Sequence, residues 1–283
     1  MNILSFDIED WWGYKISNLE SESLWLPRLN GYLDVILNNL DEVNYKATFF
    51  CLGEVAKSNP EVIKKIANRG HHIGCHSFSH NFFGKASYKE VEEDTKKAIY
   101  TIEDTIGGKI DAYRAPAFSI TKSNKWIFEI LYRYGIKYDC SIFPADRSFG
   151  GYPDFPSMKP TIVNYGDCEI KEFPIPIIRL LGREMAYSGG GYFRFIPYNK
   201  IASFVRTSDY VMTYFHIKDF DKEQARKFSA FNGENAISRY FKNYYGLNSA
   251  FRKFNKLIQE FNFMSVREAD KFIKWDTVST IKL

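Results

Sequence analysis

The chain has few cysteines, and their spacing speaks against a disulfide framework. Its 283 residues include only four, Cys51, Cys75, Cys140 and Cys168, and no two of them form a C-x-x-C pair. Without such pairs we expect reduced thiols that pack as small apolar side chains.

Long apolar runs and basic tracts are also absent. No stretch approaches the length of a membrane-spanning helix, and residues 1–7 lack the basic head and cleavage site of a signal peptide. The net charge of +4 is mild and evenly spread, with no tract typical of nucleic-acid binding. We therefore expect a cytoplasmic protein that binds no nucleic acid.

The sequence leaves open a peripheral attraction to an anionic inner membrane face. A solvated helical face is the ordinary interpretation of its basic C-terminal segment. The basic residues of this segment are Arg226, Lys227, Arg239, Lys242, Arg252, Lys253 and Lys256.

Apolar and aromatic residues are abundant, at 45% and 17% of the chain, which is ample for a large core. Strand-like and helix-like segments alternate through the first half, and this rhythm predicts an α/β fold with a parallel sheet closed, or nearly closed, into a barrel. The expected strands are residues 2–6, 47–51, 72–74 and 109–113, and the expected helices are residues 28–40, 60–70, 88–106 and 124–134.

The pattern changes in the second half of the chain. Residues 156–195 predict a β excursion, and a helical extension is expected from about residue 233. With no linker or repeat between these parts, we expect a single domain over residues 1–283.

Four polar residues, Asp7, His76, Arg114 and Asp139, each follow a strand-like segment. In α/β barrels the chemistry lies at the C-terminal ends of the strands, so this shared placement predicts that they meet. His76 and His80 stand four residues apart, which would put both imidazoles on one face of a helical turn. Together with one carboxylate they predict an open, catalytic metal site.

Six segments, in this order, resemble the polysaccharide deacetylase family of carbohydrate esterases, and a further glycine-rich stretch, Ser188-Gly189-Gly190-Gly191-Tyr192-Phe193-Arg194, resembles its exopolysaccharide subgroup. The six segments are Asp7-Ile8-Glu9-Asp10, Ala47-Thr48-Phe49-Phe50, His76-Ser77-Phe78-Ser79-His80, Arg114-Ala115-Pro116, Tyr138-Asp139-Cys140-Ser141-Ile142-Phe143-Pro144 and Phe215-His216. The resemblance implies a distorted (β/α) barrel of seven or eight strands with added C-terminal helices.

The resemblance also implies a metal site. His76 and His80 would hold a divalent ion, most readily Zn²⁺, although Co²⁺ and Ni²⁺ suit the same ligands. Family members place two adjacent aspartates where this chain has Asp7-Ile8-Glu9-Asp10. Strand alternation puts Glu9 on the same side as Asp7, whereas Asp10 keeps the usual residue type, so the third ligand is Glu9 or Asp10.

Further roles follow from the resemblance. Asp7 corresponds to the general base, Arg114 to its ion-pair partner and His216 to the general acid. Asp139 is expected to hydrogen-bond His216 and raise its pKa. The backbone N–H of Ala117 is a candidate donor to the oxyanion.

The implied substrate is an N-acetylated amino sugar in a surface polysaccharide or glycolipid precursor. Trp11, Trp12 and Tyr192 flank the motifs and are candidate sugar platforms. Two alternatives remain: an amidohydrolase acting on a non-sugar C–N bond, and a catalytically silent sugar-binding protein. The sequence does not define an oligomeric state.

Overall fold

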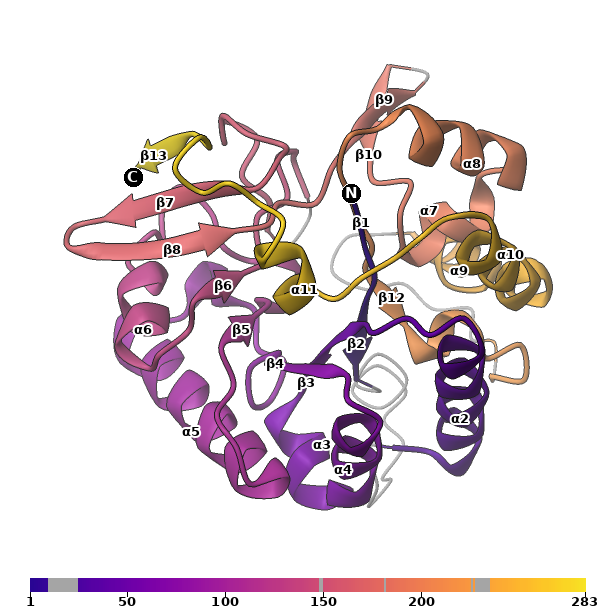
Figure 1. Cartoon of the computed structure of the whole chain (residues 1–283), viewed down its shortest axis with the longest axis horizontal. Helices are drawn as coiled ribbons and strands as arrows, with labels where there is room; N and C mark the ends of the chain where they lie inside the picture. Colours follow the sequence, from indigo (N-terminus) through magenta and orange to yellow (C-terminus); the bar gives the residue numbers. More distant parts are fainter. Residues whose placement is uncertain (10–24, 148–149, 181, 225, 227–234) are drawn as a thin grey trace.

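A mostly parallel sheet curls into an incomplete barrel, with helices packed around its outside (Figure 1). The computed structural model describes residues 1–9, 25–147, 150–180, 182–224, 226 and 235–283. The main sheet has the strand order β12-β2-β3-β4-β5-β6-β8-β7-β13, and neighbours are parallel from β12 to β8. These seven parallel strands confirm the predicted distorted barrel.

The strands are short and largely buried. They are β1 (Asn2–Ile3), β2 (Ser5–Ile8), β3 (Thr48–Cys51), β4 (His72–Cys75), β5 (Ala112–Tyr113), β6 (Tyr138–Asp139), β7 (Thr161–Tyr165), β8 (Cys168–Glu172), β9 (Ile178–Leu180), β10 (Arg183–Met185), β11 (Val211–Met212), β12 (Phe215–His216) and β13 (Thr280–Lys282). β1 pairs in parallel with β11, and the strands that follow them, β2 and β12, also pair in parallel. The two short pairs are therefore the two halves of a pair of interrupted strands.

Some of the helices begin at a capping side chain, namely α5, α9 and α11. In α5, for example, Ser87 and Glu90 form a reciprocal capping box, and Gly107 ends the helix at φ 67°. The α-helices are α2 (Pro27–Glu42), α3 (Gly53–Ser58), α4 (Pro60–Asn68), α5 (Tyr88–Ile106), α6 (Ile127–Arg133), α7 (Gly190–Phe195), α8 (Tyr198–Thr207), α9 (Ala236–Tyr244), α10 (Leu247–Glu260) and α11 (Val266–Asp270). Three 3₁₀ turns accompany them, η1 (Phe83–Lys85), η2 (Pro116–Phe118) and η3 (Ile217–Asp219).

The expected β excursion is in part a barrel strand. β8 lies parallel to β6, with Asp139 opposite Glu172, so it closes the sheet instead of leaving it. Only its antiparallel partner β7 and the hairpin β9–β10 extend beyond the parallel run, and β7 in turn pairs with the C-terminal strand β13. The sequence pattern missed this because β8 alternates in burial and so resembles an exposed hairpin strand.

The basic C-terminal segment does not form one free cationic face. Lys253 donates hydrogen bonds to the carbonyl oxygens of Phe193, Arg194 and Ile196 and so caps the end of α7, while Arg239 is buried. Among the residues of this segment, Lys227 lies outside the described part of the chain. Within the described ranges, no helix is both long and apolar enough to cross a bilayer.

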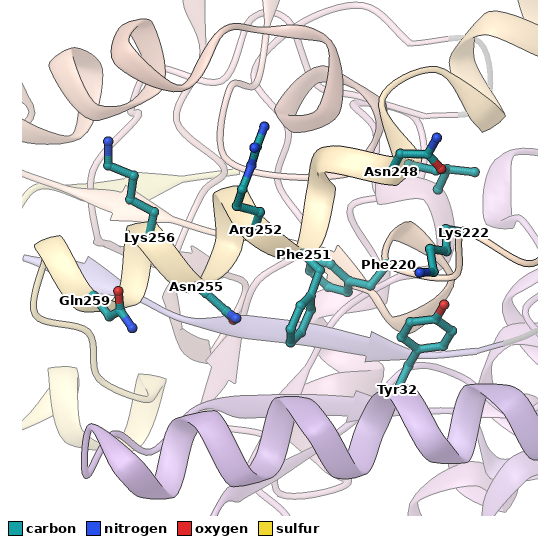
Figure 2. Close-up of a pocket in the computed structure, with 10 residues that line it drawn as sticks. Tyr32, Phe220, Lys222, Asn248, Phe251, Arg252, Asn255, Lys256 and Gln259 are labelled. Atoms are coloured by element: carbon teal, nitrogen blue, oxygen red, sulfur yellow. The ribbon is translucent and has the colours of Figure 1, made fainter.

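A cavity of about 700 Å³ lies between α2 and α10. Phe251 and Asn255 point from α10 toward α2, whereas Arg252 and Lys256 extend the other way (Figure 2). None of the predicted site residues lines this cavity. The chemistry therefore has to be sought at the strand ends.

His71 couples the stability of the barrel to pH. The backbone N–H of Ala47 donates to Nδ1 of His71 at 3.2 Å, and burial, followed by the charge of Lys46, lowers the pKa of His71 to about 4. Protonation would bury a charge and replace the acceptor by a donor. Because the unfolded imidazole has a pKa near 6.5, this contribution to stability is present above that pH and is lost as the pH falls toward 4.

We expect the free energy of unfolding to fall by about 1–2 kcal/mol between pH 7 and pH 5 on account of His71 alone. His71→Asn keeps an acceptor oxygen but cannot take up the proton, so its stability should depend less on pH. Urea unfolding of both proteins at the two pH values measures the difference. Equal pH dependence in the two proteins would show that His71 is not the titrating group.

Candidate metal centre and active site

A carboxylate and two imidazoles converge at the C-terminal ends of β2 and β4. Glu9, His76 and His80 each offer one ligand atom, and these atoms lie within 4.8 Å of one another. Oε2 of Glu9 is 2.5 Å from Nε2 of His80 and 3.4 Å from Nε2 of His76. All three side chains are buried, and Glu9 is fully so.

The segment from His76 to His80 is a loop and not the helical turn that the spacing predicted. Ser77 and His80 have φ of 67° and 56°, a left-handed conformation that non-glycine residues seldom adopt. Asp94 holds the loop by accepting from the backbone N–H groups of Phe78 and Ser79, and Ser77 Oγ accepts from the N–H of His80. The two imidazoles therefore meet because of a strained loop supported by α5.

The protonation states suit metal binding. Nδ1 of His76 is 2.7 Å from the carbonyl oxygen of Arg114, which can only accept, so Nδ1 carries the proton and Nε2 presents a lone pair toward Glu9. Burial lowers the pKa of His80 to about 4, which keeps this imidazole neutral. Burial opposes ionisation of Glu9, but His80, Lys218 and His216 hold its pKa well below the usual range. An ionised carboxylate and two neutral imidazoles are the donor set that a divalent transition metal prefers.

Asp7 and Arg114 form a buried ion pair beside this cluster. Nη1 of Arg114 donates to Oδ1 of Asp7 at 2.8 Å, and Nη2 donates to Ser5 Oγ at 2.8 Å. Nε of Arg114 reaches the carbonyl oxygen of Cys140, and the guanidinium lies 4.2 Å from the ring centroid of Phe50. Ser5 and Asp7 alternate along β2 and both contact Arg114, and Glu9, just after the strand, lies on the same side as Asp7, against His216.

His216 completes the site from β12. Its Nε2 lies 3.2 Å from Oε1 of Glu9 and 3.6 Å from Oδ2 of Asp7. Its Nδ1 is 3.1 Å from Oδ2 of Asp219, which also accepts from the backbone N–H of His216. Although burial alone would lower it, Glu9 and Asp219 raise the pKa of His216 to about 9. This histidine is therefore protonated at neutral pH.

The partner of His216 is Asp219 and not Asp139, which corrects the sequence-based prediction. Asp219 is itself buried and pairs with Nη1 of Arg194, from α7, at 3.0 Å. Burial works against its ionisation, but Arg194 and His216 lower the pKa of Asp219 to about 2. Sequence reasoning missed Asp219 because it lies inside the short turn η3, three residues after His216.

Asp139 instead supports the turn that follows Arg114. Ser141 Oγ donates to Asp139 at 2.5 Å and accepts from the backbone N–H of Ala115. Burial, followed by the neighbouring Asp139, raises the pKa of Glu172 well above its usual range, which favours the neutral form of Glu172. This arrangement leaves Asp139 committed to the structure of the loop.

Ala117 lies in the strained turn η2. Ala117 and Phe118 have φ of 52° and 55° in succession. The recorded turn hydrogen bonds run from the N–H of Phe118 to Ala115 and from the N–H of Ser119 to Pro116, so neither uses the N–H of Ala117. Non-glycine residues in this region cost of order 1–3 kcal/mol each and gather at functional sites. The geometry is compatible with the expected donor role of Ala117.

The remaining predicted residues fall into two groups. Asp10, Trp11 and Trp12 lie outside the described residues. Tyr192 lies on α7, half-buried, close enough to the hydroxyl of Tyr214 to raise its pKa.

Lys218 is a further residue that the sequence did not single out. Its Nζ lies 3.3 Å from Oε1 of Glu9, so the carboxylate faces an ammonium group as well as His216. In the sequence, Lys218 is only a lysine two positions after the strand-end histidine. Such a pattern is too common to identify a site residue without the fold.

Two family profiles match this chain, and each match contains some of the site residues. Residues 23–138 match the polysaccharide deacetylase family, and residues 140–271 match a domain of unknown function, DUF3473. The first match contains His76, His80 and Arg114, and the second contains His216 and Asp219. Asp7 and Glu9 precede both matches.

Curated relatives resemble only part of the chain. The chain is 37% identical over 95 residues to a peptidoglycan-N-acetylglucosamine deacetylase of Bacillus cereus, covering 33% of this chain and 34% of the relative. It is 37% identical over 94 residues to the uncharacterized protein YlxY of Bacillus subtilis, covering 33% and 30%. The match thus spans about a third of the length of these relatives.

Solved structures share the fold over nearly the whole chain. A Mycobacterium smegmatis protein assigned as a polysaccharide deacetylase superposes with a TM-score of 0.67 at 16% identity, covering 100% of this chain and 92% of that one. BA3943 of Bacillus anthracis, a CE4 family pseudoenzyme, gives 0.52 at 14% identity, covering 99% and 66%. Over residues 23–138 the chain matches the polysaccharide deacetylase family, and the barrel is the fold that these solved structures share.

Proposed function

We propose that the protein is a metal-dependent hydrolase that removes the acetyl group from an N-acetylated amino sugar. The observation that supports this most directly is the contact of three arrangements within one buried site. These are the Glu9–His76–His80 cluster, the Asp7–Arg114 ion pair and the His216–Asp219 pair. A divalent ion held by the cluster would supply Lewis-acid polarisation of the amide and a more acidic water.

Side chains of the site can accept and donate the protons that amide hydrolysis transfers. Asp7, whose orientation Arg114 fixes, would accept the proton of the water that attacks the acetamide carbon. His216, protonated on Nε2, would donate a proton to the nitrogen as the C–N bond breaks, so that acetate and a free amine leave. The N–H of Ala117 would hydrogen-bond the oxyanion of the tetrahedral state.

The same proposal covers which saccharide the protein deacetylates and which metal it binds. The likeness of residues 188–194 to the exopolysaccharide subgroup favours a surface polysaccharide or glycolipid precursor, handled in the cytoplasm at the inner membrane face. Several relatives are peptidoglycan-N-acetylglucosamine deacetylases, which favours peptidoglycan instead. Zn²⁺ is the metal that we expect, because two imidazoles and a carboxylate suit it well.

Acetate release tests the proposed function. Purified protein reconstituted with Zn²⁺ should release acetate from oligomers of N-acetylglucosamine, from N-acetylated peptidoglycan fragments or from lipid-linked acetamido sugars. Release from cyclic amides alone would favour an amidohydrolase with another substrate. Sugar binding without acetate release from any of these substrates would favour the silent binding protein.

The pairing of His216 with Asp219 predicts a specific pH effect. Asp219→Asn keeps an oxygen that can accept from Nδ1 but removes the negative charge, so the pKa of His216 should fall. Activity requires the protonated imidazole and is lost as the pH rises through that pKa. We therefore expect the alkaline limb of the kcat profile to move to lower pH, with kcat at pH 8 reduced about 10- to 100-fold.

The matched variant is Asp139→Asn, which changes a buried carboxylate that does not contact His216. It should leave the position of the alkaline limb unchanged, whatever its effect on stability. A shift of the limb in Asp139→Asn but not in Asp219→Asn would restore the original assignment.

A further inference from the structure

An exposed arginine near the site has no carboxylate partner among the residues that the structure describes. Arg147, in the loop after β6, places its guanidinium 4.4 Å from the ring centroid of Phe143 and 5.7 Å from that of Phe118. No described carboxylate comes within ion-pair distance of it. Other arginines of the described chain, such as Arg28, Arg133 and Arg206, each pair with an acidic side chain.

The position of Arg147 is built by close packing. Gly150 and Gly151 let the loop approach the turn η2, because a Cβ on Gly150 would lie 2.2 Å from the carbonyl oxygen of Phe118. The N–H of Gly151 donates to that same oxygen. The guanidinium is thus held on one side by the aromatic rings of Phe143 and Phe118.

Arg147 is connected to the catalytic groups through the ring of Phe118. The ring of Phe118, beneath it, follows Ala117 directly in the chain and lies 5.9 Å from the guanidinium of Arg114. The ring of Tyr214 packs edge-on against Phe118 at 5.3 Å. Burial, together with Tyr192 and Asp219, raises the pKa of Tyr214 to about 12. Arg147, Tyr214 and the turn η2, which contains Ala117, therefore meet around the ring of Phe118.

We propose that Arg147 binds a carboxylate on the substrate, so that the preferred substrate is an acidic N-acetylated saccharide. This inference rests on the proposed deacetylase function and narrows its substrate. A guanidinium presents a planar fork of donors that matches a carboxylate, and Arg147 is exposed while the face of its guanidinium rests on aromatic rings. Because no carboxylate of the described residues neutralises Arg147, binding an anionic sugar would break no ion pair seen in the structure.

The experiment compares three oligosaccharides of equal length. One alternates N-acetylglucosamine with glucuronic acid, the second is the same compound with each carboxyl group reduced to an alcohol, and the third is this reduced compound with one phosphate monoester. Dissociation constants are measured by calorimetry on metal-loaded protein, and kcat/KM by acetate release. The wild type should bind the carboxylated compound about 10-fold more tightly than the reduced one, a difference of about 1.4 kcal/mol.

Arg147→Gln should bring this affinity ratio to within about twofold of unity, and Arg147→Lys should restore it only in part, because an ammonium lacks the fork. Lys122→Gln is the matched control. It removes another exposed cation, one that pairs with Asp154, and should leave the ratio unchanged.

The two readouts separate the proposals. Loss of the affinity ratio in Arg147→Gln supports this inference even if no compound is deacetylated, in which case the proposed function fails by itself. Equal affinity of the wild type for the carboxylated and reduced compounds, or an unchanged ratio in Arg147→Gln, overturns the role of Arg147. Preference for the phosphorylated over the carboxylated compound also overturns it and assigns a phosphate-bearing substrate.

Discussion

Replacement of Asp7 by asparagine should lower kcat for acetate release by about 100- to 10,000-fold, the range that general-base catalysis contributes. The change removes the base but little else. Asparagine has nearly the same shape and its oxygen can still accept from Nη1 of Arg114, which now lies 2.8 Å from Oδ1 of Asp7. The barrel and the Glu9–His76–His80 cluster should therefore persist, and the loss should appear in kcat more than in KM.

The controls for Asp7→Asn are metal content and folding. The variant should bind the same amount of Zn²⁺ as the wild type, measured by elemental analysis. Its free energy of unfolding should lie within about 2 kcal/mol of the wild-type value, because one buried charged hydrogen bond is weakened. Asp154→Asn, a change of an exposed aspartate that pairs only with Lys122, should retain full turnover. Turnover within a few-fold of the wild type in Asp7→Asn would assign the base to another residue.

The catalytic face of the barrel could be predicted from the sequence because its residues follow strands. Asp7, His76 and Arg114 stand at the ends of β2, β4 and β5, and parallel strands bring such ends together whatever the intervening helices do. Strand alternation also put Glu9 on the side of Asp7, and the structure places its carboxylate against both imidazoles. These inferences needed only the two-residue period of a strand.

The rest of the site depends on loops whose conformation has no simple sequence pattern. The distant Asp94 holds the loop between Ser77 and His80 by accepting hydrogen bonds from its backbone N–H groups, so a helical turn was the natural but wrong expectation. Similarly, Asp219 and Asp139 are both acidic residues near strand ends. Only the fold shows that one lies against His216 while the other is bonded to Ser141.

The division of the chain into two profile matches hides one functional unit. His216 and Asp219 lie within residues 140–271, yet they contact Glu9 and complete a site whose imidazoles come from residues 23–138. β8, from the second region, also lies parallel to β6 from the first. Within the described chain, the segment of unknown function therefore supplies His216 and Asp219 to the site and a strand to the barrel, and we propose that the two regions act as a single domain.

Glu9→Gln should weaken Zn²⁺ binding by at least about 100-fold. Loss of residues that only support metal ligands costs about 10- to 100-fold in affinity, so loss of a direct ligand should cost no less. Glutamine keeps the size of the side chain but not the charge that His80, Lys218 and His216 now stabilise. Competition with a chromophoric chelator measures the affinity, and thermal unfolding gives an independent readout, since Zn²⁺ at 100 times its dissociation constant stabilises by about 2.7 kcal/mol.

Asp10→Asn is the decisive comparison, because Asp10 is the other carboxylate that the sequence offers as third ligand. We expect Asp10→Asn to bind Zn²⁺ with an affinity within a few-fold of the wild type and to keep the thermal shift, whereas Glu9→Gln loses both. The opposite pattern would move the third ligand to Asp10 and leave Glu9 as the partner of Lys218 and His216. If both variants still bind Zn²⁺, the two imidazoles hold the metal without a carboxylate from this segment. In that case His80→Ala alone should abolish the thermal shift.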